Sequence, residues 1–161
     1  MVLQLPDKDS YKNFIEYCSR NRNKDIFSIF NKEDPYDKTT VFDFIDNHWI
    51  DYTYSNIEKV IRSDLYKGDG TIEYRIAYIC VELNLLHALP NGNKRTSIFV
   101  MWILLFLNFS SNTANNIGNI LTNMDSEYIY NFAKHIASEG AKSRERNIQD
   151  LTQYLKNLSQ Q

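Results

Sequence analysis

The sequence contains little cysteine, proline or glycine. Its 161 residues include two Cys, three Pro and five Gly. Cys18 and Cys80 are far apart in the chain and show neither disulfide-framework nor metal-ligand spacing, so we expect two buried thiols in a reducing compartment. Because no proline-rich linker, internal repeat or long charge block divides the chain, we predict a single domain over residues 1–161.

The sequence also lacks an excess of positive charge and a long apolar run. Its 18 Lys and Arg residues oppose 20 Asp and Glu residues, which gives a net charge of −2. This balance leaves no basic surplus for neutralising a nucleic-acid backbone, so we expect no direct nucleic-acid binding. The longest apolar run, Ile98 to Leu107, has about half of the roughly 20 residues that a membrane crossing requires. Since the N-terminus has no signal-peptide pattern, we expect a cytoplasmic protein without a membrane partner.

The apolar residues of the sequence follow a helical periodicity. Apolar residues recur three and four positions apart along most of the chain, which predicts an all-α fold. The expected helices lie around residues 11–18, 41–48, 57–61, 71–87, 93–109, 117–124, 129–136 and 148–158. The expected core stripe of the helix at 71–87 consists of Ile72, Ile76, Ile79, Cys80, Leu83 and Leu86. Asp125 and Gly140 are typical helix-boundary residues, whereas periodicity leaves open whether Ile26 to Phe30 form a short strand or a buried turn.

The segment at 93–109 differs from the other helical segments because it is apolar on nearly every face. A helix that is apolar all round belongs in the interior of a fold. We therefore predict a compact helical bundle around one central buried helix. Pro90 separates this helix from the preceding one, and Asn93 can cap its start.

The candidate chemistry lies at the start of this central helix, where Lys94 and Arg95 stand in its first turn. A helix N-terminus carries about half a positive charge and several unpaired N–H groups, so cations there are normally unfavourable. Two cations in that position favour an occupant that brings negative charge, such as phosphate. Gly92 supports this interpretation, because a residue without Cβ lets an anion approach the backbone closely.

His87 stands at the end of the preceding helix, just before the connecting loop. An imidazole suits a general base that removes a hydroxyl proton while the oxygen attacks phosphorus. A second interpretation is open on these residues alone. A His is favoured at a helix C-terminus, an Asn-Gly-Asn loop is ordinary between helices, and no GxxxxGK[ST] phosphate loop is present.

The stretch HALPNGNKRTS resembles the signature of the Fic/Doc (Fido) family, which is roughly His-x-Phe-x-Asp/Glu-Gly/Ala-Asn-Gly/Lys-Arg. The shared positions are His87, Gly92, Asn93, Lys94 and Arg95. At position 94 the sequence resembles the death-on-curing (Doc) branch, which has Lys there. Fic proper usually has Gly at this position and a second Arg at the position of Ile98. The resemblance covers about residues 40–140, and only the motif itself is specific.

The resemblance implies a toxin-like, ATP-dependent transferase that phosphorylates a protein hydroxyl, in the Doc branch that of a translation factor, and so arrests growth. Transfer of AMP, as in Fic proper, is the alternative. The resemblance implies that His87 is the catalytic base and that the phosphate clamp consists of Gly92, Asn93, Lys94 and Arg95. It also implies Mg²⁺, and a short β-hairpin flap near residues 62–70 that docks the target protein by strand addition.

Two features of the sequence depart from the family pattern. Asn91 stands where the family has the Asp or Glu that holds Mg²⁺, and Leu89 replaces the Phe. Since Mg²⁺ prefers anionic oxygen, Asn91 is a weak metal ligand, and a catalytically degenerate binding module is a further alternative.

The sequence also lacks the family's own inhibitory motif, Ser/Thr-x-x-x-Glu-Gly/Asn. Glu139 is the only Glu followed by Gly or Asn, and His135 stands four residues before it. We therefore expect a separate antitoxin chain as the restraint on activity.

Overall fold

The computed structural model describes residues 3–21, 23, 38, 54–56, 58–60, 63, 70–87, 93–109, 120 and 123–160. All regular structure in these ranges is helical, which confirms the all-α class. None of the helices in these ranges is long and apolar enough to cross a membrane. The helix expected at 41–48 and the stretch from Ile26 to Phe30 lie outside the described residues.

Helices α4 (Ile72–Leu86) and α5 (Asn93–Phe109) have nearly the predicted bounds. The hydroxyl oxygen of Thr71 caps α4 by accepting a hydrogen bond of 3.2 Å from the backbone N–H of Tyr74. At its other end, α4 stops at His87, which adopts a left-handed conformation. Asn93 is the first residue of α5 that the structure describes.

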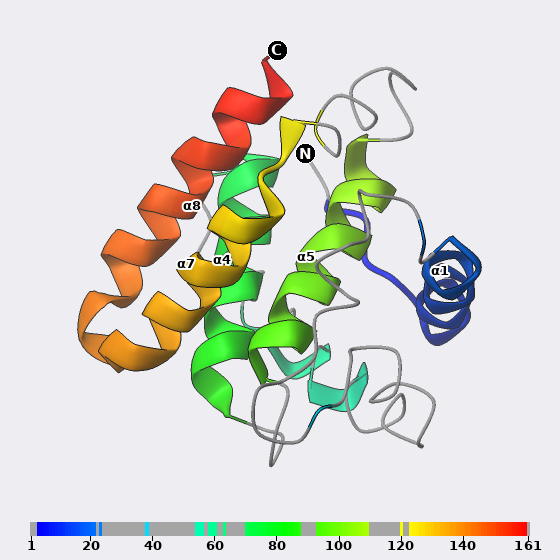
Figure 1. The fold of residues 1–161 in the computed structure, drawn as a ribbon, viewed down its shortest axis with the longest axis horizontal. Helices are drawn as coiled ribbons and strands as arrows, with labels where there is room; N and C mark the ends of the chain where they lie inside the picture. Colours follow the sequence, from blue (N-terminus) through cyan, green and yellow to red (C-terminus); the bar gives the residue numbers. More distant parts are fainter. Residues whose placement is uncertain are drawn as a thin grey trace.

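The core is built around α4 and α5, which pack antiparallel to each other (Figure 1). Every residue of α5 from Ser97 to Leu105 is buried, as the apolar pattern predicts. In α4, every residue from Ile76 to Val81 is also buried, so the centre of the bundle is a pair of helices rather than the single helix expected. Leu86 was expected in the core, but it is the last residue of α4 and is 47% exposed.

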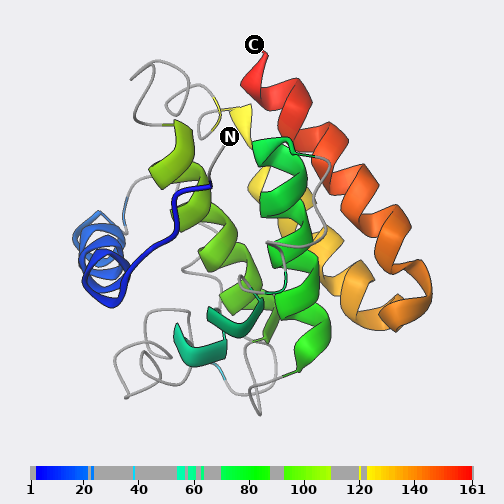
Figure 2. The ribbon, with the colours of Figure 1, turned by 180° about the vertical axis from the view of Figure 1, so that it is seen from behind.

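Helix α1 (Lys8–Arg20) packs on the side of α5 that faces away from α8 (Figures 1 and 2). Its contacts are aromatic. The rings of Tyr11 and Phe14 lie 5.8 and 5.4 Å from the ring of Phe99, and Phe14 also lies 5.6 Å from Phe106. Such pairs add to the stability gained from burial alone. The predicted helix around residues 11–18 is therefore confirmed, and its stripe of aromatic residues explains where it docks.

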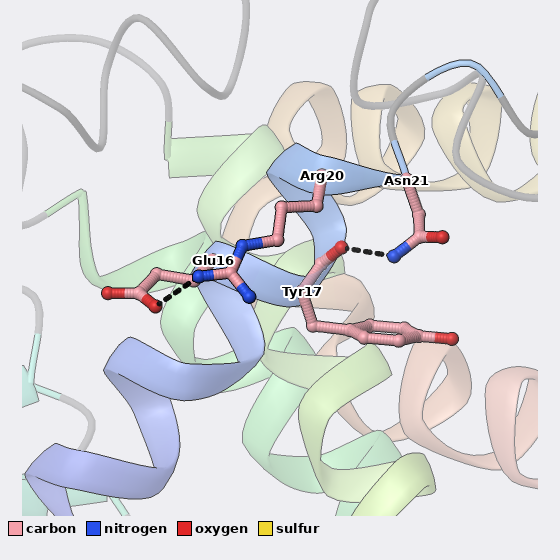
Figure 3. A network of polar contacts seen from close by, with 4 residues as sticks. All are labelled: Glu16, Tyr17, Arg20 and Asn21. Atoms are coloured by element: carbon pink, nitrogen blue, oxygen red, sulfur yellow. Dashed lines mark hydrogen bonds and ion pairs between the residues drawn. The ribbon is translucent and has the colours of Figure 1, made fainter.

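The end of α1 is closed by Asn21, as Figure 3 shows. The side-chain amide of Asn21 donates to the carbonyl oxygen of Tyr17 at 2.8 Å, and its backbone N–H lies 3.1 Å from the same oxygen. Arg20 pairs with Glu16 one turn earlier at 3.5 Å on the exposed surface. The two contacts of Asn21 satisfy the carbonyl group of Tyr17, which a helix end would otherwise leave unpaired.

Helices α7 (Ser126–Glu139) and α8 (Arg144–Ser159) form a hairpin through the 3-10 helix η3 (Gly140–Ser143). Asp125 caps α7 by accepting hydrogen bonds from the N–H groups of Glu127 and Tyr128, and Gly140 ends α7 with a φ of 67°. Both predicted boundaries are confirmed. Polar contacts with α4 fix both ends of α8: Arg144 lies 2.9 Å from Glu82, and Ser159 donates to Glu73 at 3.0 Å.

The N-terminal segment is tied to the far end of α5 by one buried side chain. Asn108 accepts a hydrogen bond of 2.7 Å from the N–H of Gln4 and donates one of 2.9 Å to the carbonyl oxygen of Gln4. It also donates to the carbonyl oxygen of Leu104 at 2.8 Å. The amide of Asn108 thus pairs with the backbone as a second peptide group would, and it holds Leu3 in the core.

We expect Asn108→Ala to lower the free energy of unfolding by about 1–3 kcal/mol, because it leaves the polar groups of Gln4 without their partner. Gln153→Ala is the matched control, since Gln153 makes one exposed hydrogen bond to Asn157 and its loss costs little. Urea denaturation measures both. Equal midpoints for the two variants would contradict the assignment.

The two cysteines are free and buried, as expected. Burial raises the pKa of both thiols from 9.0 to about 12, and in Cys80 a hydrogen bond with Ser97 opposes part of the rise. Above pH 9 the unfolded chain therefore releases protons that the folded chain retains.

The contribution of these thiols to stability should be complete below about pH 9 and should fall as the pH rises toward 12, by up to about 1.4 kcal/mol per thiol and pH unit. Urea denaturation between pH 8 and pH 10.5 measures the slope. The double variant Cys18→Ala, Cys80→Ala should show a shallower slope, and identical slopes would show that the thiols do not contribute.

Candidate functional site

His87 has an unusual backbone conformation, with φ at 45° and ψ at 40°. This left-handed region is costly for any residue with a Cβ and is usually occupied by glycine at a helix end. The side chain of His87 is exposed. The structure therefore places the predicted base where it is accessible, at the turn where the chain leaves α4.

Lys94 and Arg95 lie in the first turn of α5, as predicted, and that turn contains no acidic residue. Their environments differ. Lys94 is exposed, whereas Arg95 is only 6% exposed. One cation thus faces solvent and the other lies beneath the surface, and both add to the positive end of the helix dipole.

The antiparallel packing brings the end of α4 and the start of α5 to the same end of the helix pair (Figure 2), and these are the helix ends that carry His87 and the two cations. Asn93 lies beside them at the start of α5 and is partly buried. The other two predicted site residues, Asn91 and Gly92, lie outside the described residues. Of the predicted flap at 62–70, the structure describes Ser63, which is helical, and Gly70, and neither belongs to a strand.

Beneath this end of the bundle lies a polar contact between buried residues that the sequence analysis missed. The side-chain amide of Asn84 donates to the carbonyl oxygen of Ala133 at 3.0 Å and lies 3.4 Å from the hydroxyl of Ser97. The hydroxyl of Ser97 in turn donates to the carbonyl oxygen of Lys94 at 2.8 Å. Asn84 and Ser97 are both fully buried. Their contact joins α4, α5 and α7 directly below the candidate site.

The spacing of buried residues along α4 could have indicated from the sequence that Asn84 is buried. It follows Ile76 and Cys80 at intervals of four residues, so it continues the buried stripe as a polar residue. Such a residue must find its hydrogen-bond partners inside the protein.

The described residues do not supply a site for Mg²⁺. Within the described ranges, no group of three or more His, Cys, Asp or Glu side chains is placed to hold a metal ion. His135 pairs with Glu139 at 3.1 Å on its own helix. The arrangement fits an anion better than a cation, because its charged groups are Lys94 and Arg95.

Comparison of the chain with protein-family models, curated proteins and solved structures gives no match.

The left-handed conformation of His87 leads to a test of its effect on stability. We expect His87→Gly to raise the free energy of unfolding by about 1 kcal/mol, because glycine adopts the left-handed region without steric cost. His87→Ala, which keeps the Cβ, is the matched control and should give no such gain. Thermal or urea denaturation measures both, and equal stability of the two variants would show that the left-handed conformation costs nothing.

Proposed function

We propose that this protein is an ATP-dependent transferase of the Fic/Doc type, with a toxin-like role, that phosphorylates a hydroxyl group of another protein. One observation carries the proposal. Lys94 and Arg95 occupy the first turn of α5, without an acidic residue in that turn, at the same end of the molecule as the exposed His87. The resemblance of the loop sequence to the Fic/Doc signature is the reason for proposing phosphate transfer to a protein hydroxyl as the reaction.

The charge arrangement supports a polyphosphate ligand. Cations in the first turn of a helix raise a positive potential that is already present from the dipole and the unpaired N–H groups. No acidic residue within the first turn of α5 offsets this potential locally. The phosphates of ATP would supply the negative charge, with Lys94 as the contact at the surface and Arg95 below it.

In the proposed reaction, His87 takes the proton of the acceptor hydroxyl. The acceptor oxygen forms a bond to the γ-phosphorus of ATP, and the bond between that phosphorus and the bridging oxygen breaks, which releases ADP. The role of the helix start is to hold the phosphates in place. Exposure of His87 is necessary for this chemistry, because a protein substrate must reach the imidazole.

The proposed target protein docks near residues 62–70. Ser63, at the start of this stretch, is anchored to α4: its hydroxyl lies 3.3 Å from the hydroxyl of Tyr78 and donates to the carbonyl oxygen of Val60 at 2.6 Å. Ser63 is therefore in contact with the helix that ends at His87. We further propose that a separate antitoxin chain restrains the activity, and that a translation factor is the target.

Labelled ATP tests this proposal. When the protein is incubated with cell lysate and ATP, we expect label from the γ-position on a lysate protein and none from the α-position. His87→Ala should abolish the transfer, because no base is left to take the proton. Lys94→Ala should weaken ATP binding by about tenfold, since it removes one charge-assisted contact with phosphate. Autoradiography after electrophoresis measures the transfer, and calorimetry measures the binding.

Other outcomes would replace the proposed reaction. Label from the α-position on protein would show AMP transfer. The third possibility, a degenerate module that only binds, is favoured by Asn91 in place of the family's acidic residue. It predicts no transfer by the natural chain and transfer by Asn91→Asp. ATP binding that is unchanged in Lys94→Ala would contradict the assignment of the site itself.

A further inference from the structure

The buried pair of Asn84 and Ser97 carries an inference that rests on the proposed function. We infer that Ser97 is a positioning residue, held by Asn84, which fixes the phosphate-binding start of α5 relative to the end of α4. Neither side chain reaches the surface, so neither contacts the substrate. Their effect on the site would pass through the backbone of Lys94.

The contacts link the two halves of the candidate site. Ser97 lies three residues after Lys94, and its hydroxyl donates to the carbonyl oxygen of Lys94 at 2.8 Å. Asn84 lies three residues before His87, and its amide nitrogen lies 3.4 Å from the hydroxyl oxygen of Ser97. One contact between side chains therefore joins the turn that ends in His87 to the turn that begins with Lys94.

A third helix anchors this link. The same amide nitrogen of Asn84 donates to the carbonyl oxygen of Ala133 in α7 at 3.0 Å. The carbonyl oxygen of Ala133 can only accept a hydrogen bond, so the NH2 group of Asn84 rather than its oxygen must face α7. The orientation of Asn84 is therefore set by α7, and Asn84 in turn faces Ser97 in a defined direction.

Stability alone does not explain these residues. The Oδ1 atom of Asn84 is buried without a hydrogen-bond partner, which is costly in the interior of a protein. The neighbours of Asn84 in sequence are Leu83 and Leu85, and a third apolar residue would avoid this cost. A hydroxyl that bonds back to its own helix, as that of Ser97 does, adds little stability to a helix. Local costs of this kind are expected where side chains are placed for function.

The test compares Ser97→Ala with a matched control, Thr152→Val. Both variants remove one buried hydroxyl that donates to a carbonyl oxygen of its own helix. The hydroxyl of Thr152 donates to Ile148 in α8 at 2.6 Å, outside the candidate site. Calorimetry with ATP and with inorganic triphosphate measures affinity, and urea denaturation shows that each variant is folded.

We expect Ser97→Ala to weaken the binding of ATP and of triphosphate by a similar factor, about three- to tenfold, because the phosphate end of the site is displaced. Thr152→Val should leave both affinities unchanged while it lowers stability to a comparable extent. Ser97→Thr, which keeps the hydroxyl, should bind within about twofold of the natural chain. Asn84→Ser, which is too short to reach Ala133, is a second variant, and it should weaken both ligands as Ser97→Ala does.

The outcomes distinguish this inference from the proposed function. If the natural chain binds ATP and triphosphate, and Ser97→Ala and Asn84→Ser bind them equally well, Ser97 has only a structural role and the inference is wrong. If Thr152→Val weakens binding as much as Ser97→Ala does, the effect reflects general destabilisation, and the inference is also wrong. If the natural chain binds neither ligand, the proposed function fails, and this inference fails with it.

Discussion

The antiparallel packing of α4 against α5 is the constraint on which the rest of the structure depends. Only residues 87–92 separate the two helices, so the end of one must lie close to the start of the other. Both helices are buried over most of their length, which leaves little freedom for them to slide or rotate. Core packing thus places the end of α4, with His87, and the start of α5, with Lys94.

The start of α5 and the adjacent end of α4 combine features that lower the stability of the protein when no ligand is bound. Two cations stand at the positive end of a helix dipole, one of them almost fully buried, and His87 adopts a left-handed conformation nearby. Each feature costs free energy on its own. Together they occur at one end of the molecule, directly above the polar pair of Asn84 and Ser97. An anionic ligand would offset the electrostatic part of this cost, which is why we assign the function to this end.

Local signals in the sequence predicted much of the fold. The boundaries at Asp125 and Gly140 and the apolar periodicity of 71–87 and 148–158 act within single helices, so the residues themselves contain the information. The burial of Arg95 and the contact of Asn84 with Ala133 depend on how separate helices meet. No local pattern fixes such contacts. The candidate site was predictable in part for the same reason: its motif is contiguous, but the buried polar contact next to it joins residues of three helices.

The central claim is that the first turn of α5 binds phosphate. The most direct measurement is a nuclear magnetic resonance titration of the natural chain with ATP, in which the backbone amide signals of Asn93, Lys94 and Arg95 are followed together with those of α8 as an internal reference. Our account predicts saturable shifts at the start of α5 and none along α8. Unchanged signals at the start of α5, at ATP concentrations that saturate any binding detected by calorimetry, would contradict it.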